Sequence, residues 1–289
     1  MLRSVDFSGG VVMVTGIRRS LRVACVALGV ASLAAIGGAH AQGDRSARPG
    51  DFDYYVLTLN WSPTYCAGRE EDGGNDRGRT RYEDNGYGGG YRFFDDRRSR
   101  RDSGTEQQCN GTRPYAFVLH GLWPQYERRG WPESCRTDSR PWVPNELIDR
   151  MLDIMPSRQL VIHEYKKHGT CSGLDPRGYF AAARKAYSSI RIPDEFQDLT
   201  KPLRVGPEEV RRAFLDVNRG LTPDMVQIVC SRNRLQEVRI CMTKDLQPRP
   251  CAEGDQKRRL CNYDTVTMPP VRGGGVGPQG GQTQRGDRL

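Results

Sequence analysis

The sequence predicts an α+β fold for the body of this 289-residue chain. Stretches with the composition of strands and stretches with helical periodicity both occur, but they do not alternate regularly, which disfavours a doubly wound parallel sheet. Of the nine cysteines, the eight that follow residue 41 form an even set, which favours disulfide bonds in an exported protein. A mean hydropathy of −0.69 excludes a polytopic membrane protein.

Composition and periodicity predict strands and helices along the body of the chain. Four stretches are rich in β-branched, aromatic or other apolar residues and are predicted as strands: residues 53–61, 115–119, 225–229 and 235–242. Three stretches are predicted as helices, the first from the spacing of Leu147, Met151 and Met155: residues 145–155, 179–190 and 207–217.

The first 41 residues have the composition of a secretory signal peptide. Three arginines between positions 18 and 22 precede the apolar run 23–36, and an Ala-His-Ala site ends at Ala41. This run is too short and too rich in glycine for a membrane span, and an uncleaved anchor is the alternative. Cleavage would remove four arginines and one aspartate, which lowers the formal charge from +9 to +6. We expect a periplasmic or secreted protein without stable membrane association.

Two segments are predicted to lie outside the packed domain of residues 42–265. Residues 68–105 contain nine Gly, nine Arg and nine Asp or Glu, so they have little apolar surface to bury. We interpret them as an insertion without a fixed fold, with Cys66 and Cys109 at its neck, and an RNA-contacting loop is the alternative. Residues 266–289 are rich in Gly and Gln and are predicted as a flexible tail.

The histidines outside the signal segment fall in two short segments. The first runs from Phe117 to Gln125. We expect its strand to end at His120, followed by a turn at Gly121 and by Trp123, on which a planar base could stack. The alternative is a structural tryptophan beside a histidine with no reactive role.

The second segment, from Val161 to Cys171, is predicted to be helical. At about 100° per residue, the four polar side chains of His163, Glu164, Lys167 and His168 project from one arc of about 140°. Gly169 is the expected stop signal of this helix. A solvated polar helix is the alternative. The two histidines are five residues apart rather than four, and a lysine lies between them, so zinc binding is disfavoured.

These two segments resemble the two active-site motifs of the ribonuclease T2 family. Residues 60–66, Asn-Trp-Ser-Pro-Thr-Tyr-Cys, resemble the end of that family's N-terminal strand. The resemblance covers about residues 51–265 without 68–105, and Tyr165 stands where the second motif usually has tryptophan. It implies a ribonuclease T2-like α+β fold, with a central antiparallel sheet packed with helices and stapled by disulfides.

Eight cysteines allow 105 pairings, so the sequence alone leaves the disulfides open. The resemblance implies a bond between Cys135 and Cys171. It also suits a nested arrangement in which a Cys230–Cys261 bond surrounds a Cys241–Cys251 bond.

The resemblance implies an endoribonuclease that cleaves single-stranded RNA, acts as a monomer and needs no cofactor or metal. It assigns the general base to His168 and the general acid to His120. The other residues with implied roles are His163 for phosphate binding, Glu164 and Lys167 for the transition state, and Trp123 and Gln125 for the nucleotide. The product would be a 2′,3′-cyclic phosphate and then a 3′-phosphate, and DNA would resist cleavage because it lacks the 2′-OH. The alternatives are an inactive family member that binds RNA or protein, and a disulfide-stapled binding protein.

Overall fold

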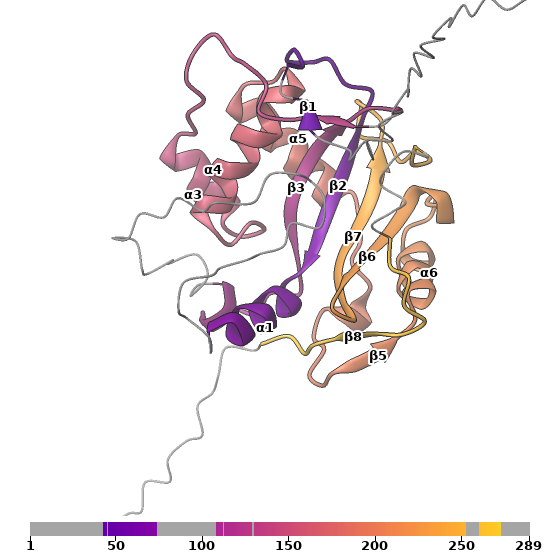
Figure 1. The fold of residues 1–289 in the computed structure, drawn as a ribbon. Coiled ribbons are helices and arrows are strands. Elements are labelled where there is room, and N and C mark those ends of the chain that lie inside the picture. The colour runs from indigo at the N-terminus through magenta and orange to yellow at the C-terminus, as the bar shows by residue number, and fades with distance from the viewer. Residues whose placement is uncertain are drawn as a thin grey trace, which may run out of the picture. The chain divides into compact units, whose positions relative to one another are not determined.

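The structure is a computed structural model that describes residues 43–44, 46–73, 108–111, 113–128, 130–252 and 260–272 (Figure 1). The expected signal peptide, most of the expected insertion and residues 273–289 of the expected tail lie outside the described residues. Within the described ranges, no helix is long and apolar enough to cross a membrane.

The central sheet has six strands in the part of the chain that the structure describes. The strands are β2 (Tyr54–Trp61), β3 (Phe117–Gln125), β5 (Leu203–Val205), β6 (Val226–Ser231), β7 (Arg234–Met242) and β8 (Val266–Met268). Their order is β3-β2-β7-β8-β5, and β6 also pairs with β7. All pairings are antiparallel except that of β7 with β8, so the expected α+β class is confirmed. A separate parallel pair joins β1 (Gly43–Asp44) to β4 (Trp131–Pro132).

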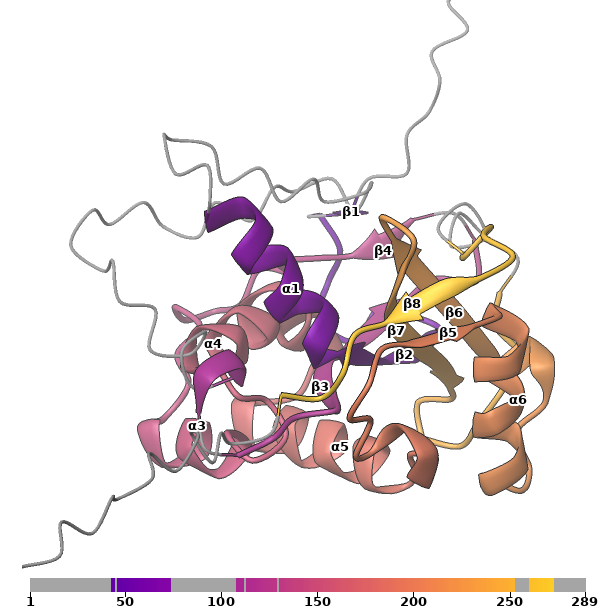
Figure 2. The same cartoon turned by 90° about the horizontal axis from the view of Figure 1, so that it is seen from below.

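Helices lie at both ends of this sheet. They are α1 (Ser62–Gly73), α3 (Asn145–Met151), α4 (Arg158–Lys167), α5 (Pro176–Ser188) and α6 (Pro207–Val217), with 3-10 turns at Gly169–Ser172, Asp194–Phe196 and Pro223–Met225. Figures 1 and 2 show α3, α4 and α5 grouped beside β3, whereas α6 lies beside β6. Asp175 caps α5 by accepting a hydrogen bond from the Gly178 amide at 2.7 Å.

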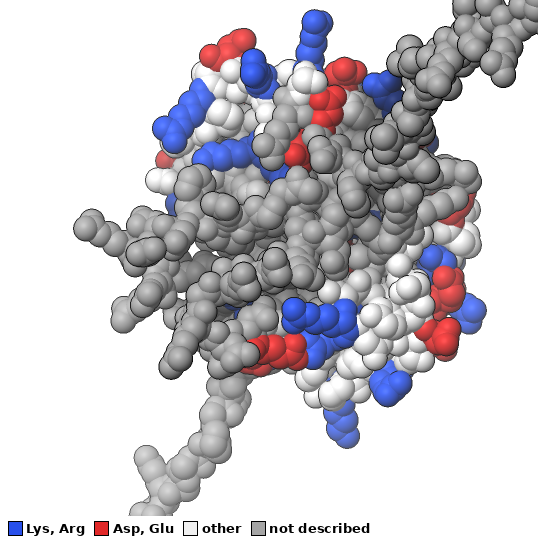
Figure 3. All heavy atoms as spheres, in the orientation of Figure 1, with Lys and Arg blue, Asp and Glu red and all other residues white. Residues whose placement is uncertain are grey.

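The core lies against one face of the sheet, and the strands alternate accordingly. Leu57, Leu59 and Trp61 of β2 point into this core together with Val238 and Ile240 of β7. The opposite face holds polar and charged side chains of β2 and β7, together with a small apolar cluster of Tyr54, Val56 and Cys241. The basic and acidic groups at the surface are interspersed over the described part of the face in Figure 3.

Several predicted boundaries differ from the structure. Strand β8 lies within the expected tail of residues 266–289, and its Val266 and Met268 are buried in the core. Helix α5 begins at Pro176 rather than at residue 179. The helix expected over 145–155 ends at Met151 as α3. Helix α1 continues to Gly73, six residues into the expected insertion. At the surface of this continuation, Arg272 donates to Glu70 at 2.6 Å and Arg234 donates to Glu71 at 3.0 Å.

Four disulfides join the described cysteines: Cys66–Cys109, Cys135–Cys171, Cys230–Cys261 and Cys241–Cys251. The first links α1 to the residues that follow the expected insertion. The second links the loop after β4 to the 3-10 turn that follows α4. The last two have the nested arrangement that the resemblance suggested.

Candidate active site

His120 is the extra residue of a β-bulge in β3. Thr58 pairs with Gly121 and Leu59 pairs with Leu119, so His120 has no direct partner on β2. The bulge reverses the alternation of β3, which places Gly121 and Trp123 on the sheet face opposite Leu119. The expected strand end and turn at Gly121 are therefore wrong. The strand continues to Gln125, and the bulge, not a turn, orients the imidazole.

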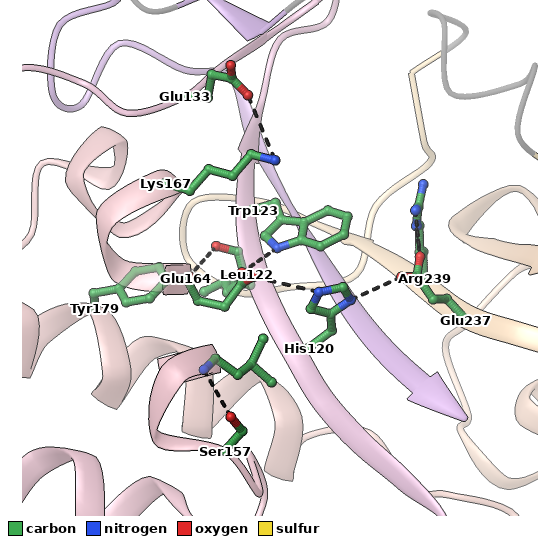
Figure 4. Close-up of polar contacts among 11 residues, drawn as sticks. His120, Leu122, Trp123, Glu133, Ser157, Glu164, Lys167, Tyr179, Glu237 and Arg239 are labelled. Carbon is green, nitrogen blue, oxygen red and sulfur yellow. Dashed lines mark hydrogen bonds and ion pairs between the residues drawn. The ribbon is translucent and has the colours of Figure 1, made fainter. Parts of the chain in front are cut away.

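Glu237 and Arg239 of β7 lie on this same face, because they pair with Asn60 and Thr58 of β2. Their exposed fractions are only 3% and 4%. His120 Nδ1 lies 3.0 Å from Glu237 Oε1. Glu237 Oε2 accepts hydrogen bonds from Arg239 Nε at 2.8 Å and Nη2 at 2.5 Å. Figure 4 shows the His120 ring between the carboxylates of Glu237 and Glu164.

Helix α4 supplies the remaining polar groups from the side of β3. Ser157 caps this helix by accepting a hydrogen bond from the Leu160 amide at 3.3 Å. Glu164 is 0% exposed and accepts a hydrogen bond from Trp123 Nε1 at 2.7 Å. Its other oxygen, Oε1, lies 3.7 Å from His120 Nε2. Glu164 thus connects the bulge of β3 to the helix.

His168 lies just past the last residue of α4. Its backbone has φ −113° and ψ −44°, and α4 ends at Lys167. The helix therefore stops near Gly169, as predicted, but His168, the last of the four polar residues expected on one helix face, lies outside it. The imidazole is buried and stacks on the Trp123 ring, with 5.1 Å between centroids and 25° between planes. The end of the helix therefore brings His168 to the indole that also adjoins His120.

Trp123 and Gln125 are more buried than their expected nucleotide-binding roles require. Trp123 is 5% exposed, and Gln125 is 1% exposed. The indole stacks on His168 and makes an edge-to-face contact with His120, with 5.1 Å between the ring centroids. The Cζ atom of Arg239 lies over the indole, 5.2 Å from the centroid of the indole ring. This burial does not fit an open platform for a base. In this structure Trp123 is instead the common packing surface of the two imidazoles.

Lys167 is held close to the loop that follows β4. Its Nζ lies 4.0 Å from Glu133 Oε2, and that oxygen accepts a hydrogen bond from Trp131 Nε1 at 3.3 Å. The Ser134 amide donates to the Lys167 carbonyl at 2.7 Å, and the neighbouring Cys135 is bonded to Cys171. The disulfide and this hydrogen bond place a buried carboxylate beside the ammonium group.

Gly121 permits the close approach of β3 and α4. A Cβ atom at this position would lie 2.1 Å from Glu164 Oε2 and 2.5 Å from Trp123 Nε1. Any side chain would therefore displace the hydrogen bond between these two residues.

Burial and neighbouring charges shift the pKa values of the imidazoles in opposite directions. Burial works to lower the pKa of His120, but the hydrogen bond to Glu237 and the charge of Glu164 outweigh it, so that pKa is raised. Burial and then the Lys167 cation lower the pKa of His168 well below its ordinary value. The same two causes lower the pKa of His163 to about 3. Two imidazoles beside one indole therefore favour opposite protonation states.

The carboxylates differ as well. Burial works to raise the pKa of Glu237, but the Arg239 charge and the His120 hydrogen bond hold it at about 2. Burial raises the pKa of Glu164, and the charge of His120 and the indole hydrogen bond oppose that rise. With its pKa raised, His120 suits an acid, and with its pKa lowered, His168 suits a base, so the pair can transfer two protons in one reaction.

Sequence reasoning missed Glu133, Glu237 and Arg239. Alternating charges in an apolar strand are typical of a solvated sheet face, and this pattern concealed the two β7 residues. For Glu133, a signal was available in the sequence. Glu133 lies two residues before Cys135, which was expected to bond to Cys171, just after the helix that carries Lys167. In the described ranges, no group of three or more His, Cys, Asp or Glu side chains could hold a metal ion.

Comparison with known proteins gives a consistent match. The model of the ribonuclease T2 family matches residues 52–251. The chain is 30% identical to a ribonuclease from Aeromonas hydrophila over 228 residues, which cover 77% of this chain and 88% of that protein. It is 29% identical to a probable ribonuclease from Haemophilus influenzae over 147 residues, which are 50% of this chain and 45% of that protein. Among solved structures, an RNase-related protein from Calystegia sepium aligns with a TM-score of 0.51 at 18% identity, over 76% of this chain and 98% of that one.

Proposed function

Because the chain belongs to the ribonuclease T2 family, we propose that it is an endoribonuclease that cleaves single-stranded RNA with His120 and His168 as proton carriers. The observation that supports this most directly is the opposite shift in the pKa of the two imidazoles on one indole. Such a pair suits a reaction that needs a base and an acid together.

His168 is the proposed general base. RNA has an internal nucleophile, the 2′-OH next to the scissile phosphate, and this hydroxyl must lose its proton as it attacks phosphorus. A base must be neutral to accept a proton, and the lowered pKa of His168 keeps its ring neutral. Stacking on Trp123 fixes the plane of the ring.

His120 is the proposed general acid. The leaving 5′-oxygen must be protonated as its bond to phosphorus breaks, which requires an imidazolium. The contacts of His120 with Glu237 and Glu164 raise its pKa and favour that form. The two steps together produce a 2′,3′-cyclic phosphate, whose hydrolysis gives a 3′-phosphate.

The other groups of α4 act on the phosphate. Lys167 supplies positive charge for the phosphorane-like transition state, and Glu164 supports the same state and orients His120. His163 binds phosphate as a neutral N–H donor, because a pKa of about 3 leaves its ring uncharged near pH 7. No step in this scheme requires a metal, and DNA lacks the nucleophile.

A cleavage assay on defined RNA oligonucleotides, with analysis of the new ends, tests this function. Cyclic-phosphate ends are expected, and a purified chain that binds RNA without cutting it would instead be an inactive family member. The variants His120→Ala and His168→Ala should each lower kcat/KM by at least about 10²-fold. Near-normal cleavage by either folded variant would contradict its assigned role.

Export is part of the same proposal. The composition of residues 1–41 and the four disulfides support a site of action in the periplasm or the medium. N-terminal sequencing of the protein from a periplasmic fraction should begin at Gln42. A chain that retains residues 1–41 in the cell would contradict export.

A further inference from the structure

Glu237 and Arg239 form a buried ion pair that the proposed proton transfers do not use directly. The two side chains are almost completely excluded from solvent, although both are charged. Buried charges are costly unless they are paired, and an ion pair of this kind is weak support for stability by itself. A role in orienting another group would account for its presence next to His120.

The strand register aims Glu237 at one particular nitrogen. Strands β7 and β3 flank β2 on its two edges. Asn60 of β2 pairs with Glu237 of β7, and His120 lies in the bulge of β3 next to the same part of β2. The result is the contact of 3.0 Å between His120 Nδ1 and Glu237 Oε1. The opposite nitrogen, Nε2, then faces Glu164 on α4, and it is the nitrogen left for the substrate.

We propose that Glu237 is a positioning residue for His120, whose carboxylate holds the Nδ1 proton so that Nε2 is the nitrogen presented to the leaving oxygen. Arg239 fixes the orientation of that carboxylate through two hydrogen bonds. This inference rests on the acid role proposed above for His120, and it adds a second layer of residues on β7 to the site.

The charges around His120 come from two elements. Glu237 and Arg239 face it from β7, and Glu164 faces it from α4. The imidazole of His163, within α4, and that of His168, just past the end of α4, also interact with it. Glu237 and Glu164 favour the imidazolium, whereas Arg239 disfavours it. Removing Glu237 and removing Arg239 should therefore move the pKa of His120 in opposite directions.

The first variant is Glu237→Gln, which keeps the shape of the side chain and removes its charge. The alkaline limb of the kcat/KM profile, which reports His120 in the free enzyme, should move down by about 1–3 pH units. Above the new limb, kcat should fall about tenfold per pH unit, whereas KM should change less than about twofold. A side chain that only supported the fold would not move this limb.

The second variant is Arg239→Met, which keeps the aliphatic stem. The hydrogen bond to His120 and the charge of His120 also lower the pKa of Glu237, and both remain after the cation is removed, so we expect the carboxylate to stay ionised near neutral pH. The alkaline limb should then move up. Glu209→Gln is the matched control, because it makes the same chemical change in the cap of α6 and should move neither limb.

Titration of the His120 ring by NMR in the full chain gives a readout that does not depend on activity. The charge-neutral double variant Glu237→Gln, Arg239→Met removes the buried pair together and protects against a fold lost to one unpaired charge. It should still lower the pKa of His120. An unchanged His120 titration in folded Glu237→Gln and in the double variant would overturn the inference. A wild-type chain that cuts no RNA would overturn the proposed function instead, and the titration would still decide the effect of Glu237 on His120.

Discussion

Replacing Gly121 with alanine tests whether the close approach of β3 and α4 holds the site together. The added Cβ would lie 2.1 Å from Glu164 Oε2, whereas ordinary contact begins at 3.4 Å. The carboxylate would have to move by the difference, about 1.3 Å, or the strand would have to move away from the helix. Either movement breaks the 2.7 Å hydrogen bond between Trp123 and Glu164.

The cost follows from two contributions. A hydrogen bond to a charged group contributes about 1.5–3 kcal/mol, and overpacking a buried site costs about 1–3 kcal/mol. We therefore expect the free energy of unfolding to fall by about 2.5–6 kcal/mol. Displacement of a group that faces His120 by about 1 Å should also lower kcat/KM by about 10²-fold.

Urea unfolding and cleavage of a defined RNA oligonucleotide measure the two effects. Gly68→Ala is the matched control, because a Cβ at that position of α1 meets nothing within 4 Å. In a helix this change should raise stability by about 0.5–1 kcal/mol and leave kcat/KM unchanged. If Gly121→Ala has the stability and kcat/KM of the wild type, the reasoning about the close approach is wrong.

Three further predictions concern the site and its support. Activity should survive EDTA, since the proposed reaction uses side chains alone, and a loss that added metal restores would refute this. Between about pH 6.5 and 5, the thermal unfolding midpoint should fall with pH, because the unfolded chain protonates His163 and His168 while their lowered pKa values resist this in the fold. The raised pKa values of His120 and Glu164 offset part of this fall. A midpoint that rises toward pH 5 would contradict the sign. Replacing both Cys135 and Cys171 with serine should lower stability by about 2–4 kcal/mol and also lower kcat, whereas unchanged unfolding in urea would show that the disulfide contributes nothing.

The strands and helices were largely predictable because their signals are local. The strand predicted over 53–61 is β2, and the helix predicted over 207–217 has the bounds of α6. The prediction that a strand ends at His120 was wrong for a physical reason. A bulge is a property of the pairing between two strands, and the second strand, β2, is remote in the sequence.

Charged residues in strands show the same limit. The alternation in β7 is compatible with a solvated face, and the burial of Glu237 and Arg239 depends on the elements that cover that face. The burial of Trp123 was equally hidden, because the groups that cover it come from three different parts of the chain.

The sequence by itself determined the residue types of the candidate site. Two segments hold every histidine that follows the expected signal peptide, and their residues carried the resemblance that the family match confirms. Only the tertiary structure decided which imidazole favours a proton. That preference depends on burial and on charges brought close in space, and Glu237 lies 117 positions from His120 in the chain. Local patterns cannot encode a pKa whose causes act across the fold.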